Sequence, residues 1–327
     1  MNEQHTALAK FGYQIRYALE HYQDHGLKVG QFHQIVIAGL GGSGIGGNIA
    51  RSIFRKHCPI TIECVADYTL PAYVNEHTLV ILNSYSGNTE ETLSVYHSVL
   101  DLKCTVLAIS SGGKLSMLAK ESGIHLSVVE SGFQPRMALG FSLTYLILIL
   151  SELLNLNNRT ELLESASAVE NSKMYQEEAH AIFESIKTKL KHKLIVLTDA
   201  FFEPIGIRFA QQIQENAKHE CFQHTLPEMN HNVIESYYGQ LESIFFLLDS
   251  HQNSRVTSRF EFLNNLLEVE YNKVIQIPVE LANIKTVYEI IHLLDWLSLY
   301  IADFRKVDSL NVPNIASLKE FLETVGE

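Results

Sequence analysis

The apolar positions of this chain fall into short runs separated by longer amphipathic segments. In the first half, five runs have the length and β-branched content of buried strands. They lie at residues 34–39, 59–66, 78–82, 104–110 and 125–129. The segments between them have helical patterns, for example at residues 48–54 and 90–100. Strands that alternate with helices predict a mainly parallel sheet with helices on both faces.

The second half has the same alternation. Strand-like runs lie at residues 192–198, 243–248 and 273–278, and a tail helix is expected at residues 315–325. The composition changes around residues 153–170, where asparagines and then charged residues follow a long apolar run. We therefore expect an α/β protein of two αβα sandwich domains. Residues 1–155 form an N-terminal helix, ending near Gly26, plus the first domain, and residues 156–327 form the second domain plus the tail helix.

Composition and charge restrict the class of protein. The chain has 327 residues, of which 46% are hydrophobic and 19% charged, which indicates a compact globular protein. It carries 37 acidic and 25 basic residues, and a net charge of −12 disfavours binding to nucleic acid or to an anionic membrane. The apolar run at residues 137–154 includes hydroxyls and Glu152, so we expect a buried helix there rather than a membrane span.

Two features indicate the cellular compartment. The first residues are polar, without the apolar core of a signal peptide. The four cysteines are scattered, and no pair has the two-residue spacing of a zinc or redox site. We expect a cytoplasmic protein with reduced cysteines.

The first candidate site is the segment NSYSGNTEET at residues 83–92, which follows a predicted strand and begins a predicted helix. It offers the hydroxyls of Ser84, Ser86 and Thr89. Free N–H groups and the positive end of a helix dipole favour a phosphate at such a turn. An ordinary helix cap explains the same residues equally well.

The second candidate site is LGGSGIGG at residues 40–47, which we expect to be a loop between a strand and a helix. It offers the backbone of Gly41 and Gly42 and the hydroxyl of Ser43. The glycines partly match a dinucleotide motif, and Asp67 ends the next predicted strand as that motif requires. A second hydroxyl-rich loop two strands later favours a phosphorylated sugar instead.

Further residues could perform proton chemistry. Arg136 precedes the long apolar helix and is either a surface cation or part of a site. Glu215 lies among so many polar residues on one helix that they cannot all face solvent, which suits a general base. An exposed network of side chains four residues apart is the alternative.

Histidines and the tail lysine complete the candidates. His231 lies between two asparagines that could orient its imidazole, or else it simply caps a helix start. The spacing of His219, His224 and His231 is not that of a metal site, so we expect no metal. Lys319 lies on the predicted tail helix, where most lysines would be solvated.

Taken together, these segments resemble the bifunctional phosphoglucose/phosphomannose isomerases, which are built from two sugar-isomerase (SIS) domains. The resemblance spans nearly the whole chain and rests on segments in the family's order. They are AGLGGSGIGG (38–47), YTLPAYV (68–74), NSYSGNTEET (83–92), QPRMALG (134–140), QIQENAK (212–218), LPEMNHN (226–232) and LLDWLSLYIADFRKVD (293–308).

The resemblance implies an aldose–ketose isomerase without a cofactor that converts glucose 6-phosphate, and mannose 6-phosphate, into fructose 6-phosphate through a cis-enediol. The phosphate would bind to Gly41, Gly42, Ser43, Ser84, Ser86 and Thr89. Glu215 would be the base and Arg136 the cation beside the enediolate. His231 would assist ring opening across the interface of a homodimer, and Lys319 would lie near the ring oxygen.

Three departures from the family pattern are visible: Asn48, Val233 and the run Asp308–Ser309–Leu310–Asn311 each replace residues that the family usually has. They leave open the balance between glucose and mannose substrates. A non-catalytic SIS protein that senses a sugar phosphate is the alternative function. The presence of both Glu215 and His231 disfavours it. A glucosamine-type isomerase would need an ammonia-producing domain, which we do not find in this sequence.

Overall fold

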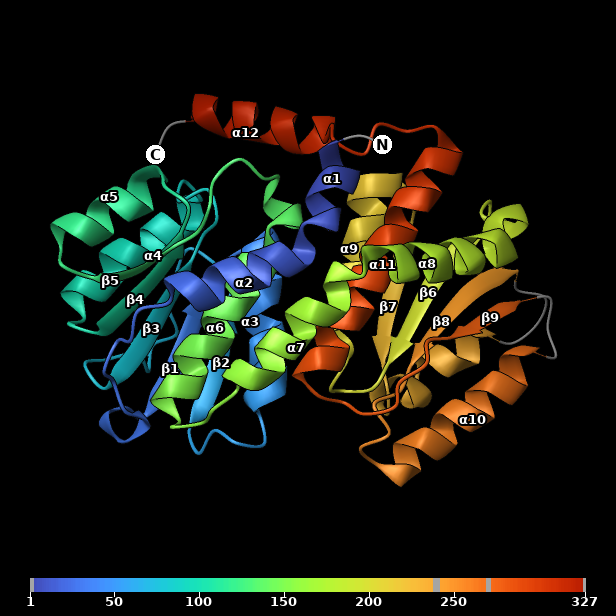
Figure 1. Ribbon diagram of the computed structural model, residues 1–327, viewed down its shortest axis with the longest axis horizontal. Helices are drawn as coiled ribbons and strands as arrows, with labels where there is room; N and C mark the ends of the chain where they lie inside the picture. The colour runs from blue at the N-terminus through green and yellow to red at the C-terminus, as the bar shows by residue number, and fades with distance from the viewer. Residues whose placement is uncertain (1–2, 238–241, 269–271, 326–327) are drawn as a thin grey trace.

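The computed structural model describes residues 3–237, 242–268 and 272–325, which contain two parallel β-sheets (Figure 1). The first sheet has the order β2-β1-β3-β4-β5 and the second β7-β6-β8-β9. The strands are β1 (Gln34–Ala38), β2 (Thr61–Val65), β3 (Thr78–Asn83), β4 (Thr105–Ser110), β5 (His125–Val128), β6 (Lys193–Thr198), β7 (Cys221–Thr225), β8 (Ser243–Leu248) and β9 (Lys273–Gln276). All neighbouring pairs run parallel, so the predicted α/β fold with two parallel sheets is confirmed.

The strands are apolar because both faces of each sheet are covered. In β1, Ile35 and Ile37 face the core between the two sheets, while Val36 and Ala38 face the outer helices. These side chains are all at most 2% exposed. Alternate residues of one strand thus belong to two different cores, which is why the strand sequences read as continuous apolar runs.

The helices form three groups (Figure 1). The outer face of the first sheet carries α4 (Glu90–Asp101) and α5 (Gly113–Glu121), and the outer face of the second carries α10 (Ser254–Glu268). The central core includes α1 (Glu3–Ala9), α2 (Phe11–His21), α3 (Gly41–Phe54), α6 (Leu139–Leu153), α7 (Arg159–Glu170), α8 (Ser172–Ile186), α9 (Glu203–Ala217) and α11 (Ile284–Arg305). The last helix, α12 (Pro313–Val325), crosses the top of the view and has no buried residue.

The N-terminal segment differs from the single helix expected from the sequence. It forms two helices that break at Lys10, and the second ends at His21 rather than near Gly26. The physical reason for the early end is Glu152 of α6. Its carboxylate accepts hydrogen bonds from the Tyr22 hydroxyl at 2.6 Å and from the backbone N–H of Gly26 at 2.7 Å. These bonds hold the chain after His21 in an extended course.

The glycine segment also differs, because α3 begins at Gly41 instead of Asn48. The turn between β1 and α3 is tight. A Cβ atom at Gly44 would lie 2.5 Å from the carbonyl oxygen of Gly39, and one at Gly39 would lie 2.6 Å from that of Asn83. Only glycine permits this close approach of backbones, so the helix can begin directly after the strand.

The apolar segment near residue 137 forms α6, which is buried along nearly its whole length. It packs against α2 and α3. Among the described residues, no helix combines the length and apolarity that crossing a membrane requires.

Candidate active site

The two predicted phosphate loops meet at the carboxyl ends of β1 and β3. The side-chain amide of Asn83 donates to the Ser43 carbonyl at 2.9 Å, and the Tyr85 backbone N–H donates to the Ser43 hydroxyl at 3.1 Å. Because β2 and β3 lie on opposite sides of β1, this is the point where the strand order reverses. Ligands of open α/β sheets bind at such a point.

Two helices begin at this place with uncapped first turns. In the described chain, neither Leu40 before α3 nor Thr89 before α4 makes a side-chain capping bond. The Thr89 hydroxyl instead pairs with that of Ser84 at 2.9 Å. The helix-cap explanation of this segment therefore does not describe its geometry, and the first-turn N–H groups remain suited to an anion.

Arg136 lies on the short 3-10 turn η2 (Pro135–Met137), directly beside the glycine segment. A Cβ atom at Gly42 would lie 3.1 Å from the carbonyl oxygen of Pro135. The Arg136 residue is only 6% exposed, so it is not the surface cation that the sequence left open. Burial lowers the pKa of its guanidinium from the ordinary value, and the carboxylate of Glu215 acts in the opposite direction.

Glu215 forms the other half of a pair with Arg136. Its Oε2 lies 3.6 Å from Nη1 of Arg136, and its side chain is 33% exposed. Glu215 is thus a carboxylate that solvent and a ligand can reach, held beside a buried cation. Its neighbours Gln212 and Asn216 are buried, so this face of α9 is not an exposed side-chain network.

Lys218 is a further cation of the site that the sequence did not single out. It ends α9 in a left-handed conformation with φ 53°, and its ammonium donates to the backbone carbonyl of Glu215. Burial lowers the pKa of Lys218, and the positive charge of Arg136 lowers it further. A lysine at a helix end is common, so no signal in the sequence distinguished it.

His231 lies elsewhere in the same chain. Because α9 runs back from the carboxyl ends of the strands, Glu215 lies near the amino end of the second sheet. His231 lies at the opposite end, on the turn η4 (Glu228–His231) that follows β7. The twelve helical steps from Glu203 to Glu215 alone span about 18 Å. One chain therefore does not bring His231 and Glu215 together.

The two asparagines beside His231 do not orient its ring as the sequence suggested. Asn230 accepts a hydrogen bond from Arg259 at 3.2 Å, and Asn232 donates to Glu228 at 3.3 Å. The two asparagine amides are thus bonded to α10 and to the first residue of η4, and these bonds stabilise the turn. The imidazole of His231 is exposed.

Lys319 lies in the middle of α12, on the exposed surface. The segment that leads into this helix is fixed to the site, because Arg136 donates to the backbone carbonyls of Ser309 and Leu310. Gln4 donates to the Ser309 carbonyl as well, at 2.8 Å. The residues that depart from the family pattern here thus contact Arg136 through their backbone.

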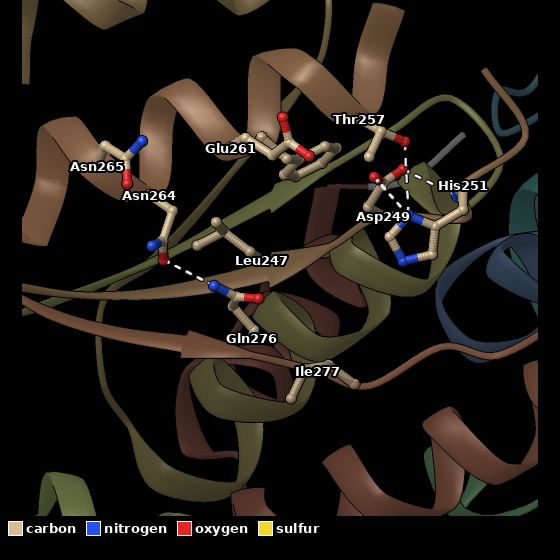
Figure 2. A pocket seen from close by; sticks show the side chains of 10 residues that line it. Leu247, Asp249, His251, Thr257, Glu261, Asn264, Asn265, Gln276 and Ile277 are labelled. Atoms are coloured by element: carbon tan, nitrogen blue, oxygen red, sulfur yellow. Dashed lines mark hydrogen bonds and ion pairs between the residues drawn. The ribbon is translucent and has the colours of Figure 1, made fainter. Parts of the chain in front are cut away.

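Among the described residues of the second sheet, the switch point beside β6 holds an acidic side chain instead of a comparable anion site. The carboxylate of Asp199, which follows β6, accepts the backbone N–H groups of Phe202 at 3.0 Å and of Ser250 at 3.3 Å. Nearby, a pocket of about 490 Å³ lies at the ends of β8 and β9 (Figure 2). Its ten lining residues include Asp249 and Glu261 and no lysine or arginine, so it disfavours a phosphate.

A metal centre is not visible in the described residues. Nowhere in residues 3–237, 242–268 and 272–325 do three His, Cys, Asp or Glu side chains gather in an arrangement that could hold a metal ion. The histidines weighed from the sequence do not share a site. His219 bonds to the Leu190 carbonyl at 2.8 Å, whereas His231 lies on the surface of η4.

Known proteins match this chain along most of its length. The family described as bacterial phospho-glucose isomerase C-terminal SIS domain matches residues 175–322. The bifunctional phosphoglucose/phosphomannose isomerase of Caldicellulosiruptor bescii is 32% identical over 314 residues, which are 92% of this chain and 93% of that protein. The enzyme of the same name from Aquifex aeolicus is 34% identical over 301 residues, with 88% and 90% covered. The chain belongs to the bifunctional phosphoglucose/phosphomannose isomerase family.

A solved structure of low sequence identity has the same fold. The C-terminal domain of glucosamine-fructose-6-phosphate aminotransferase from Francisella tularensis superposes with a TM-score of 0.77 at 15% identity. The match covers 94% of this chain and 97% of that one. Membership of the family thus agrees with the two-sheet architecture, and the SIS fold expected from the resemblance is confirmed.

Proposed function

We propose that this protein is an isomerase that interconverts glucose 6-phosphate and mannose 6-phosphate with fructose 6-phosphate. The observation that carries the proposal is the Glu215–Arg136 pair, placed beside an uncapped pair of helix N-termini. Aldose–ketose isomerisation needs a carboxylate base, a cation beside the oxygen that becomes negative, and a clamp on the phosphate. This chain holds all three groups at one end of its first sheet.

In the proposed mechanism the phosphate binds to the N–H groups of Gly41 and Gly42 and to the hydroxyls of Ser43, Ser84, Ser86 and Thr89. The bound phosphate positions C1 and C2 of the open sugar beside Glu215. The carboxylate of Glu215 removes the proton from C2 and returns it to C1, while the proton of the C2 hydroxyl passes to the oxygen on C1. The guanidinium of Arg136 stabilises the negative oxygen of the cis-enediolate between these steps. This enediolate has lost the stereocentre at C2, so both epimers lead to it.

Ring opening needs a further acid or base, and we propose that a second copy of the chain supplies it. His231 of one chain lies at the far end of the second sheet from its own Glu215. The partner subunit's His231 would therefore act at the site in a homodimer. We further propose that Lys319 approaches the ring oxygen from α12 and that the protein works in the cytoplasm without a metal.

The proposal is tested with purified protein in coupled assays on glucose 6-phosphate and mannose 6-phosphate side by side, with and without a chelator. We expect turnover of both sugars, unchanged by the chelator. Binding of sugar phosphate without turnover would favour the sensor function instead. Loss of turnover in the chelator would show that a metal takes part.

The variant Glu215→Gln tests the assigned base. It keeps the shape of the side chain and removes its basicity, so kcat should fall by about 10³-fold while sugar-phosphate binding persists. The matched control is Gln214→Ala, on the exposed side of the same helix turn. Equal activity of the Glu215→Gln variant and the control would refute the assignment.

A further inference from the structure

A network of buried polar side chains lies behind the Glu215–Arg136 pair. It joins α9 to α11 inside the mainly apolar central core. On α9, Arg208, Gln212 and Asn216 are spaced by four residues and therefore lie on one face, which points towards α11. All three are at most 3% exposed. Buried polar groups cost stability unless they are paired, so their pairing identifies what they do.

Both ends of the Asn216 amide are bonded in this network. Its Oδ1 accepts from Nε of Arg136 at 3.0 Å, and its Nδ2 donates to the Ser298 hydroxyl at 2.9 Å. The Ser298 hydroxyl in turn donates to the backbone carbonyl of Asp295 at 2.7 Å. This chain of bonds leaves one orientation for the amide, with its oxygen towards Arg136.

The backbone of Arg136 is held from the same direction. Nη2 of Arg208 donates to the Arg136 carbonyl at 3.0 Å and to the Asp295 carboxylate at 2.5 Å. Gln212 donates to the other carboxylate oxygen of Asp295 at 3.1 Å. The carboxylate is thus paired with one cation and one amide, so the buried charges compensate each other.

These contacts determine which atoms of Arg136 are free to act. Nε is bonded to Asn216, and Nη2 is bonded to the carbonyls of Ser309 and Leu310. Of the three guanidinium nitrogens, Nη1 is the one that faces Glu215, and it lies 3.6 Å from the Glu215 carboxylate. A planar guanidinium that is bonded at Nε and Nη2 cannot rotate about its long axis without breaking both bonds.

We infer that Asn216 is a positioning residue, which fixes the plane of Arg136 so that Nη1 faces the reacting oxygen. The inference rests on the proposed function, in which Arg136 stabilises the negative charge of the enediolate. Asn216 does not touch the substrate and acts only through Arg136. The loss of Asn216 should therefore reduce kcat. It should leave phosphate binding almost unchanged, because the phosphate is proposed to bind to other residues.

A double-mutant cycle tests this inference in the full-length protein. Asn216→Ala should lower kcat by about 10–100-fold with KM changed by less than about threefold, since small misplacements of a catalytic group have effects of this size. Arg136→Ala should lower kcat further. In the Arg136→Ala background, Asn216→Ala should change kcat by less than about twofold, because the residue through which it acts is absent.

The control is Thr144→Val, which removes a buried hydroxyl of α6 that is bonded to the Gly140 carbonyl at 2.6 Å and to the Tyr288 hydroxyl at 2.7 Å, and not to Arg136 or Asn216. It should lower the melting temperature and leave kcat unchanged. If Asn216→Ala fails to fold, Ser298→Ala replaces it, because it removes one anchor of the same amide. That variant should lower kcat several-fold, again only when Arg136 is present.

The outcomes separate the two proposals. An inactive wild type would overturn the proposed function itself. An active wild type in which Asn216→Ala and Arg136→Ala lower kcat additively, or in which Asn216→Ala leaves kcat unchanged, would overturn the inference alone. A rise in KM without loss of kcat would also overturn it, because it would place Asn216 with the substrate-binding residues.

Discussion

At the scale of single residues, the hydroxyls of the proposed phosphate cradle, the segment at residues 83–89, fall into two kinds. Ser86 is exposed, whereas Ser84 is 1% exposed and is bonded within the cradle. The Ser84 hydroxyl pairs with Thr89 and accepts the backbone N–H of Gly87 at 3.2 Å. One hydroxyl is thus available to a ligand, and the other also holds the loop in shape.

We predict that Ser86→Ala raises KM by about tenfold with little change in stability, because it removes the proposed contact to the phosphate and otherwise only an exposed 3.3 Å bond from the backbone N–H of Asn88. Ser84→Ala should raise KM as well and also lower the free energy of unfolding by about 1 kcal/mol or more, since it removes the internal bonds to Thr89 and Gly87. Steady-state kinetics and urea unfolding of both variants measure the two effects. An unchanged KM in Ser86→Ala would show that its hydroxyl does not contact the phosphate.

His292 on α11 gives a prediction for pH. It is fully buried, and Nε2 is bonded to the Ser172 hydroxyl at 3.1 Å and to the indole N–H of Trp296 at 3.2 Å. Burial lowers its pKa from 6.5 to about 3. Between these two values the unfolded chain binds a proton that the folded chain does not. Stability should therefore fall as the pH is lowered from 6.5 towards 3.

In His292→Leu the unfolded chain no longer binds this extra proton. The unfolding free energy should therefore change with pH less steeply, by about 1.4 kcal/mol per pH unit. Trp296 keeps a partner in the variant, because its N–H also contacts the Ser172 hydroxyl at 3.2 Å. Urea unfolding at several pH values between 4 and 6.5 measures the slope. The exposed His97→Leu is the control, and equal slopes in the two variants would contradict the prediction.

At the scale of elements, the cradle depends on close contact between two loops. Gly87 has φ 67°, and a Cβ atom there would lie 1.9 Å from the carbonyl oxygen of Gly112. Gly113, the first residue of α5, has φ 65°, and a Cβ atom there would lie 2.4 Å from the Ser86 carbonyl oxygen. Glycine thus allows the loop after β3 and the loop after β4 to touch.

Gly87→Ala should therefore lower the free energy of unfolding by about 2 kcal/mol or more and also weaken phosphate binding, because the two loops must separate. Thermal unfolding and titration with inorganic phosphate measure the two effects. The control is Gly30→Ala, where a Cβ atom would meet nothing within 4 Å. Similar stability of the two variants would show that the loops adapt to each other.

The elements themselves could be predicted because both faces of each sheet are buried. Continuous apolar runs such as TLVIL marked β3 correctly, and the alternation with helices gave the parallel fold. The end of α2 could not be predicted, since it depends on Glu152, which is distant in sequence. The start of α3 was missed because its glycines suggest a loop, although here they allow close backbone contact.

The site could be predicted only in part, because some of its contacts join residues that are distant in sequence. The hydroxyl-rich segments, Arg136 and Glu215 were visible as residue types in suitable positions. The bond from Asn216 to Arg136 joins residues 80 positions apart, and only the packing of two domains shows it. The polar residues on α9 and Asp295 in an apolar helix were the available signals, because buried polar groups require partners.

At the scale of the whole molecule, one chain leaves two features without an explanation. His231 lies at the opposite end of the second sheet from Glu215. The helix α12 exposes an apolar stripe, with Leu318, Phe321 and Val325 each more than half exposed. Exposed apolar surface of this kind is typical of a protein interface. Both features agree with the proposed homodimer, in which the partner subunit's His231 completes the site.

Mixing two inactive variants tests this arrangement. We predict that Glu215→Gln and His231→Ala homodimers are each nearly inactive, and that unfolding and refolding them together restores turnover. In a mixed dimer, the site with the intact Glu215 receives His231 from the Glu215→Gln chain, while the other site lacks both groups. Equal mixing makes half of the dimers mixed, so activity should reach roughly a quarter of the wild-type value. Each variant refolded alone is the control. If His231 served its own chain, no mixed site would be complete, and the mixture would remain as inactive as its components.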